Sequence, residues 1–188
     1  DACGACPSCR KWEKLAHPDV HFVFPFLKRP KKEVCNDFLP EWRELLMTMP
    51  YFEMNDFLDA INASNGQPVI YGKESDEINK KLSLKSSEGG AKVVVFWLPE
   101  KMNATSANKL LKLIEEPPAA TYFILVSNDV EKVLPTIVSR TQQIRIPPIA
   151  KQDIMAALQE RYSLSPSDSG QIAHIAMGSF VKALQTIH

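Results

Sequence analysis

Two uninterrupted apolar runs constrain the fold of this chain more than any other feature. Residues 92–98 (KVVVFWL) and 121–128 (TYFILVSN) each have the length and composition of a buried strand. A helix is predicted between them from its N-cap residue Asn103, because apolar residues then recur on one helical face, at Ala107, Leu110, Leu111 and Ile114. Strands that alternate with helices indicate an α/β fold with a parallel sheet buried on both faces.

The segments that flank these runs extend the pattern. Residues 21–27 (HFVFPFL) are strand-like but interrupted by Pro25, and residues 142–148 (QQIRIPP) predict a further short strand. Apolar residues at mixed helical spacing over residues 38–62 predict two helices that separate at Pro50. Together with the two long runs, these segments make up the expected α/β core.

The sequence becomes purely helical after residue 148. Apolar residues at helical spacing predict three helices, marked by Ile154, Ala157 and Leu158, by Ile172, Ile175 and Ala176, and by Leu184 and Ile187. Gly178 is expected to end the second helix and Ser179 to cap the third. Residues 151–188 should therefore form a small three-helix bundle.

Composition and charge restrict the function only loosely. Acidic and basic residues balance, 22 against 22, so contact with nucleic acid would need a local patch such as KRPKK (28–32), which is more simply explained as a solvated loop. No apolar run approaches the roughly 18 residues of a membrane span, and no signal peptide is visible, so a cytoplasmic protein is expected. The chain begins with Asp1 inside a cysteine motif, and we expect it to be a fragment.

Cys3, Cys6 and Cys9 form a C-x2-C-x2-C motif. Thiolates at this spacing can converge on one Zn²⁺ from a turn, whereas a disulfide across so short a loop would be strained. Zinc takes four ligands, and the fourth would be Cys35, His17 or a cysteine upstream. A closed thiolate site has no open position for a substrate, so the expected zinc is structural, with reduced thiols lacking metal as the alternative.

A nucleotide site would suit an α/β core, but no phosphate-binding loop can be identified. The closest stretch is GQPVIYGKE (66–74), which has five residues between its glycines instead of four. Lys73 is followed by Glu74, whose negative charge would stand where phosphate and Mg²⁺ belong. We therefore expect that this chain binds no ATP.

Five stretches, in order, resemble one family. They are CGACPSC (3–9), HPD (17–19), NKLLKLIEEPP (108–118), VLPTIVSRT (133–141) and GSFVKAL (178–184). The chain is similar to the AAA+ subunits of the bacterial clamp loader, the assembly of DNA polymerase III that loads the sliding clamp. The similarity covers residues 1–20 and about 91–188.

The resemblance implies a domain layout and a set of partners. Residues 1–148 would be a partial AAA+ (RecA-like) parallel-sheet core, with a zinc module at about 1–20 and a divergent insert, of no assigned role, at about 21–90. Residues 151–188 would be the helical lid. The partners would be the clamp-loader ATPase subunits, the delta subunit, the sliding clamp, and primed DNA through the complex.

Two kinds of subunit share these motifs, the ATP-hydrolysing gamma/tau motors and the delta-prime subunit. In the motors the strand at 92–98 ends in an Asp-Glu pair that holds Mg²⁺ and activates water. Trp97 and Leu98 occupy those positions here, and Glu100 lies two residues further on. A lid arginine that touches phosphate is replaced by Val181. The chain is therefore most like the delta-prime subunit, which would not hydrolyse ATP.

Arg140 is the expected catalytic group, acting in trans. In the family, the arginine of an SRC element reaches the ATP bound by a neighbouring subunit, where a guanidinium can accelerate hydrolysis by about 10³ to 10⁵. The element here is SRT. Without the resemblance, Arg140 would be interpreted as solvated or locally paired. Glu115 and Glu116 end a helix on the unfavourable side of its dipole, and are either solvated or partners of basic groups.

The sequence leaves three functional hypotheses open. The first is a non-hydrolysing delta-prime-like subunit, not itself an enzyme, in a complex with DNA-directed DNA polymerase activity. The alternative is a gamma/tau-like ATPase motor. The third is an unrelated zinc-dependent nucleic-acid-binding module, which leaves the EEPP and SRT motifs unexplained.

Overall fold

The computed structural model describes residues 2–63 and 66–187, so Asp1 lies outside the described residues. The described chain divides into two compact units. One unit holds residues up to 48 together with 57–143, and the other holds 49–56 together with the residues from 144 onward.

The first unit is built on a parallel sheet. Its strands are β1 (Val20–Val23), β2 (Lys92–Trp97) and β3 (Thr121–Val126), in the order β1-β2-β3. The pairing places Val20 opposite Val93 and Thr121 opposite Lys92. Parallel neighbours need crossover connections, and the helices of this unit supply them. The α/β class with a parallel sheet is therefore confirmed.

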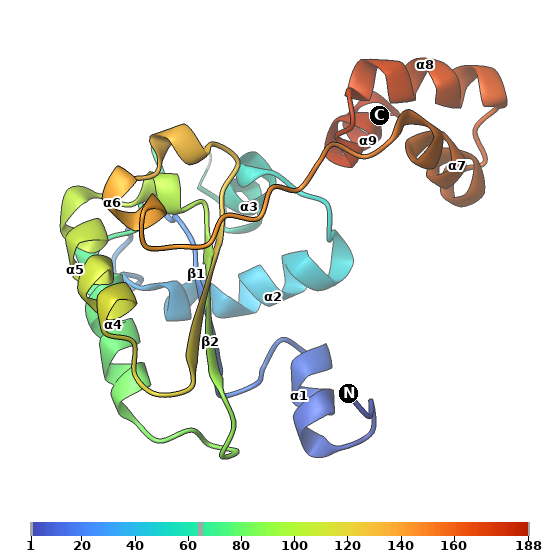
Figure 1. Ribbon diagram of the computed structural model, residues 1–188. Helices are drawn as coiled ribbons and strands as arrows, with labels where there is room; N and C mark the ends of the chain where they lie inside the picture. Colours follow the sequence, from blue (N-terminus) through green and yellow to red (C-terminus); the bar gives the residue numbers. More distant parts are fainter. Residues whose placement is uncertain (1, 64–65, 188) are drawn as a thin grey trace. The chain divides into compact units, whose positions relative to one another are not determined.

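Helices cover the sheet from both sides. They are α1 (Pro7–Glu13), α2 (Leu39–Thr48), α3 (Met54–Ala60), α4 (Gly72–Ser83), α5 (Ala104–Glu115) and α6 (Pro135–Val138). Short 3₁₀ turns span Cys35–Phe38, Pro99–Lys101 and Val130–Lys132. Figure 1 shows α4 and α5 on one face of the sheet and α2 on the other. The predicted cap of α5 is confirmed, because the Asn103 side chain accepts a hydrogen bond from the Ser106 N–H.

The segment expected to be an insert is integral to this unit. Apart from residues 49–56, which belong to the second unit, residues 21–90 supply most of β1, all of α2 and α4, and α3 from Phe57 onward. Their aromatic side chains build the core on the α2 face, where Trp42 stacks on Phe24 with ring centroids 4.3 Å apart and Phe57 meets both edge-on. The two helices predicted around Pro50 are confirmed as α2 and α3, and β1 ends before Pro25 as expected.

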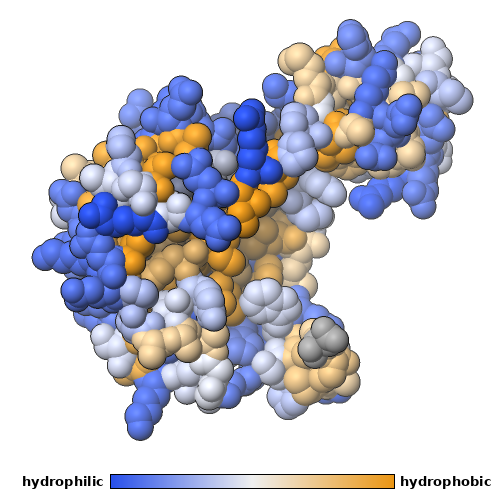
Figure 2. Space-filling view, viewed as in Figure 1, coloured by the Kyte–Doolittle hydropathy of each residue, from blue (hydrophilic) through white to orange (hydrophobic). Residues whose placement is uncertain are grey.

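Burial on both faces of the sheet holds for β1 and β2 but is wrong for β3. Tyr122, Ile124 and Val126 point to the α2 face and are 61%, 49% and 46% exposed. Neither α2 nor α3 covers β3, so these side chains remain at the surface. Figure 2 shows apolar surface over the middle of this unit, between hydrophilic flanks.

The strand predicted at residues 142–148 is also wrong. The segment has no regular structure, and Ile144 and Ile146 are 77% and 81% exposed. A β-strand exists only beside a partner strand. The sheet in the described part of the chain has three strands, and none of them pairs with these residues.

The second unit contains the expected three-helix bundle. Its helices are α7 (Lys151–Tyr162), α8 (Pro166–Ala176) and α9 (Phe180–Ile187). Their shared core consists of Ile154, Leu158, Ala173, Ala176, Phe180 and Ala183. Gly178 ends the α8 turn at φ +86°, where an added Cβ would lie 2.4 Å from the Pro148 Cβ. Ser179 caps α9 as predicted, accepting from the Lys182 N–H.

No helix in the described residues is both long and apolar enough to cross a bilayer.

Candidate functional site

The carboxyl end of β2 carries two large apolar side chains, Trp97 and Leu98. The Trp97 ring lies 5.2 Å from the Trp42 ring, and it meets Phe57 edge-on. Leu98 is 4% exposed and has a left-handed backbone, with φ at +55°. Its N–H donates to the Val126 carbonyl, which continues the pairing with β3. Both side chains therefore belong to the packing of the fold, and neither can bind a metal or polarise water.

Glu100, the nearest carboxylate along the chain, is held at the tip of β3. Its Oε2 accepts from the Ser127 hydroxyl at 2.8 Å, and its Oε1 accepts from the Asn128 N–H at 3.2 Å. Both oxygens thus join the turn after β2 to the end of β3. This arrangement gives Ser127 and Asn128 a structural role, and it leaves Glu100 poorly placed to activate water.

Residues 66–74 form no phosphate loop. Lys73 pairs with Glu33, so its charge is already compensated. Glu74 is 2% exposed and accepts from the Cys35 N–H at 2.7 Å, while burial raises the pKa of its carboxyl. Gly72 is needed for close packing, since an added Cβ would lie 2.8 Å from the Thr105 methyl. Gly72, Lys73 and Glu74 thus each have a structural role in the fold.

Arg140 follows the short helix α6 and lies at the surface. Its Nε is 2.6 Å from Glu115 Oε1, and its Nη1 donates to the Thr136 carbonyl at 3.0 Å. The side chains of Arg140 and Glu115 are 41% and 46% exposed. Thr141 donates its hydroxyl to the Ile137 carbonyl at 3.1 Å, closing the last turn. The guanidinium is therefore oriented by the end of α5 yet remains accessible.

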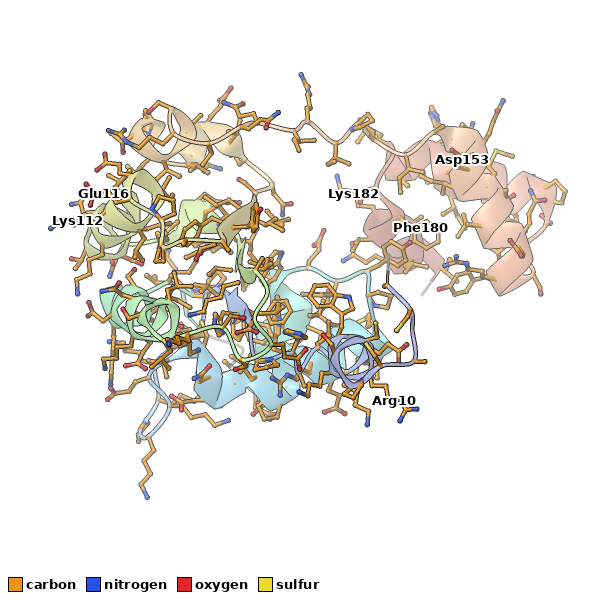
Figure 3. The ribbon with its side chains drawn as sticks, turned by 60° about the horizontal axis from the view of Figure 1, so that its bottom comes forward. Arg10, Lys112, Glu116, Asp153, Phe180 and Lys182 are labelled. Atoms are coloured by element: carbon orange, nitrogen blue, oxygen red, sulfur yellow. The ribbon has the colours of Figure 1, made fainter. Side chains whose placement is uncertain are left out.

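The link between Arg140 and Glu115 is the main feature that the sequence analysis missed. Basic partners for Glu115 and Glu116 were one alternative there, but no spacing rule identifies Arg140 across 25 residues. In Figure 3, Lys112 and Glu116 lie together at the end of α5. In the described residues Glu116 forms no ion pair, so the two adjacent carboxylates differ in environment.

Residue 181, at which the resemblance would place an arginine, is apolar. Val181 follows Phe180, which is 6% exposed and packs into the bundle. Lys182 is exposed and projects away from the bundle interior (Figure 3). A basic side chain therefore stands one residue beyond the expected position, on a different side of α9.

The three N-terminal cysteines converge. Their sulfur atoms all lie within 4.8 Å of one another, and Cys3 Sγ and Cys9 Sγ are 3.8 Å apart. A tetrahedral zinc site with Zn–S bonds of about 2.3 Å needs sulfur atoms about 3.8 Å apart, so the cluster fits. Hydrogen bonds from the Ala5 and Cys6 backbones lower the pKa of Cys3 to about 7, which favours the thiolate form that a metal binds.

The proposed fourth ligands within the chain are engaged elsewhere. Cys35 is fully buried, donates its thiol to the Phe24 carbonyl at 3.3 Å, and lies outside the cysteine cluster. His17 bonds Ser8 Oγ at 2.9 Å through Nε2 and accepts from the Asp19 N–H through Nδ1. As folded, neither side chain turns a free ligand atom toward the three sulfurs.

The basic run KRPKK is a tight turn. Arg29 and Lys32 exchange backbone hydrogen bonds at 3.0 Å. Lys28 lies over the Tyr71 ring at 4.4 Å, and Lys32 pairs with Glu41 at 2.7 Å. Two of its cations are thus used within the fold.

Comparison with known proteins identifies relatives over most of the chain. Residues 1–150 match the family described as DNA polymerase III, delta subunit. DNA polymerase III subunit delta' of Escherichia coli (strain K12) is 36% identical over 87% of this chain and 38% of its own length. The subunit delta' of Yersinia pestis is 47% identical over 74% of this chain and 30% of its own length.

A subunit of another kind is also similar. DNA polymerase III subunit gamma of Buchnera aphidicola subsp. Baizongia pistaciae is 31% identical over 56% of this chain and 28% of its own length. The chain spans about two fifths or less of the curated relatives described here.

Proposed function

The chain belongs to the family of DNA polymerase III delta subunits, and from this premise we propose that it is part of a delta-prime-like clamp-loader subunit that does not hydrolyse ATP. The similarity to two subunits named delta' supports this assignment. In this proposal the α/β unit is a partial AAA+ core and the α7–α9 bundle is the lid. Its partners are the ATPase subunits, the delta subunit, the sliding clamp and, through the complex, primed DNA.

The apolar tip of β2 carries the proposal. ATP hydrolysis needs carboxylates that hold Mg²⁺ and orient water. Trp97 is locked in an aromatic cluster, Leu98 is buried, and Glu100 is tied to Ser127. No rotamer of Trp97 or Leu98 could supply the missing carboxylates, because one side chain is an indole and the other a hydrocarbon. The strand therefore serves the fold and not hydrolysis.

Arg140 would supply the chemistry that this subunit contributes. Its guanidinium is exposed, oriented by the Thr136 carbonyl, and held by one carboxylate, that of Glu115. An exposed ion pair is worth roughly 0 to 1 kcal/mol, so a triphosphate from a neighbouring subunit can displace Glu115. The arginine would then neutralise the charge that develops on the transferred phosphoryl group.

The cysteine cluster would hold a structural Zn²⁺. Cys3, Cys6 and Cys9 supply three thiolates, and when bound the metal would tie the N-terminal turn to α1. Cys6 also caps α1, accepting from the Cys9 N–H at 3.5 Å. The fourth ligand would come from a residue outside positions 2–63 and 66–187.

A gamma/tau-like motor is the second candidate, favoured by the similarity to the Buchnera gamma subunit. It requires nucleotide to bind and hydrolyse on the same polypeptide. The apolar tip of β2 argues against hydrolysis.

Reconstitution tests the proposal. The full-length protein that carries this sequence would be purified alone and with the other clamp-loader subunits. We expect no ATP hydrolysis by the protein alone, together with loss of clamp loading when it is omitted from the assembly. Hydrolysis by the isolated protein would instead assign it to the motor class, and full clamp loading without it would remove it from the loader.

A further inference from the structure

A basic pocket lies at the amino-terminal edge of the sheet, at the opposite end of the strands from Trp97. Its volume is about 330 Å³. The lining comes from the approach to β1, from α2, from the end of α4 and from the start of β2. His17, considered above as a zinc ligand, also lines it, but neither Arg140 nor the tip of β2 nor the three N-terminal cysteines contribute, so the pocket requires a separate explanation.

Cations dominate the pocket lining. Arg43, Lys81, Lys85 and Lys92 line it, and Asp19 is the carboxylate that lines it with them. None of the four cations forms an ion pair with a carboxylate of the described chain, although many other lysines on this small protein do. In a chain with no net charge, four cations against one carboxylate around a single cavity are a local excess of positive charge.

The cations are positioned by neutral acceptors. Lys92 is 6% exposed and donates to the carbonyls of Lys81 and Leu82, each at 3.0 Å. Lys81 Nζ donates to Asn36 Oδ1 at 2.8 Å, and Arg43 Nε donates to the Leu15 carbonyl at 2.9 Å. Carbonyl and amide oxygens orient these groups but cancel only part of their charge. Lys92 also donates to the Leu84 carbonyl, which uses its three N–H groups, whereas Arg43 and Lys81 retain N–H groups from which a bound anion could accept.

The one carboxylate in the lining is fully engaged with the pocket rim. Asp19 is 3% exposed and accepts from Ser87 N at 2.9 Å, from Ser86 Oγ at 3.0 Å and from Glu88 N at 3.3 Å. Burial alone would raise the pKa of Asp19, but these three bonds lower it below its usual value. Asp19 thus shapes the loop after α4 and does not pair with the lysines.

His21 reports the electrostatic field in the pocket. Burial, together with the charges of Lys81 and Lys92, lowers the pKa of its imidazole to about 4, against a smaller opposing effect of Asp19. At neutral pH the ring is therefore uncharged and can donate one hydrogen bond. The positive charges of Lys81 and Lys92 therefore outweigh the negative charge of Asp19 at the position of His21.

We propose that this pocket binds a phosphate group. Its volume exceeds what one phosphoryl group needs, and Arg43, Lys81 and Lys85 surround it with donors suited to oxyanion geometry. A neutral His21 adds a further donor on the same wall. The phosphate can come from a small molecule, such as inorganic phosphate or pyrophosphate, or from the backbone of single-stranded DNA.

The test compares adjacent lysines of α4. Lys81→Gln removes a pocket cation, while Lys80→Gln removes an exposed lysine that is paired with Glu77 at 2.8 Å. Each variant has the same net charge, and thermal unfolding verifies that each is folded. Inorganic phosphate is titrated at constant ionic strength while backbone amide and His21 ring resonances are followed by NMR. A labelled single-stranded oligonucleotide is titrated in parallel.

We expect phosphate to shift the resonances of His21 and Lys81 and to raise the pKa of His21. Lys81→Gln should weaken binding about fivefold or more, as loss of a charge-assisted hydrogen bond implies, and Lys80→Gln less than about twofold. If DNA is the source, the oligonucleotide binds more tightly than phosphate and shows the same sensitivity. Absence of pocket shifts with both probes, or equal effects of the two variants, would overturn the proposal.

Discussion

Arg140 Nε lies 2.6 Å from Glu115 Oε1, which joins Arg140, two residues beyond the end of α6, to the last residue of α5. This ion pair connects the two most specific sequence motifs of the chain, EEPP and SRT. Both side chains are more than two fifths exposed, so the pair orients the guanidinium without burying it. The arginine is thereby presented at the surface in one preferred direction.

Replacing Glu115 by glutamine should make the Arg140 guanidinium more mobile while destabilising the fold only slightly. The exposed pair contributes little, so the free energy of unfolding should fall by less than about 1 kcal/mol for Glu115→Gln. The Arg140 Nε–H resonance should move toward its position in a disordered peptide. Glu116→Gln is the matched control and should leave that resonance in place. Equal shifts in both variants would show that the pair does not exist in solution.

Serine at any one of the three N-terminal cysteines should abolish metal binding. Three thiolates within 4.8 Å supply most of the ligand set, so losing one leaves too few. Zinc per chain, measured by atomic emission on the full-length protein, should fall from about one to near zero in Cys3→Ser. Cys35→Ser should retain the metal, because its sulfur is buried against the Phe24 carbonyl. Zinc lost only from Cys35→Ser would contradict this placement.

Trp97→Ala should destabilise the fold. The ring packs against Trp42 and Phe57, and deleting a large aromatic from such a cluster costs roughly 2 to 4 kcal/mol. Trp12 is 53% exposed, so Trp12→Ala should cost less than about 1 kcal/mol. Urea unfolding of the two variants measures the difference. Similar stabilities would mean that the tip of β2 is not packed as described.

His21 should make the fold sensitive to moderate acid. Its pKa is about 4 when folded, against an unfolded value near 6.5, so the unfolded chain takes up a proton first as pH falls. The stabilising contribution is complete above pH 6.5 and is lost as pH falls toward 4. The ring is only half-buried, which reduces the effect to about 1 to 2 kcal/mol. His21→Gln should remove this part of the pH dependence of the free energy of unfolding. If the variant and the original protein show the same dependence, His21 is not its source.

Much of the fold was predictable because its signals are local. The runs that became β2 and β3, the Asn103 cap and the three C-terminal helices follow from periodicity and capping chemistry. Helix α4 was missed because Ile78 and Leu82 are its only large apolar side chains, and its first residues resembled a phosphate loop. The strand expected at residues 142–148 failed because pairing depends on a partner that local sequence cannot supply.

The candidate site also combines features that the sequence predicts with features that only the folded chain reveals. The cysteine cluster follows from a spacing of three residues, and the apolar tip of β2 follows from aligning one motif. The contacts of Arg140 with Glu115 and of Glu100 with Ser127 join residues more than 20 positions apart, so they depend on the packing of α5 and β3. The position of Cys35, buried and outside the cluster of three cysteines, likewise depends on the folded chain and not on sequence spacing.

The most direct measurement is the DNA- and clamp-stimulated ATPase rate of the reconstituted clamp loader that contains the full-length protein with Arg140→Ala. Arg145→Ala, an exposed arginine in the irregular segment after Arg140, is the control, and assembly of both variants is verified first. The proposed role of Arg140 in trans predicts a fall of about tenfold or more for Arg140→Ala at the neighbouring site, with little change for Arg145→Ala. An unchanged rate in a fully assembled Arg140→Ala complex would contradict it.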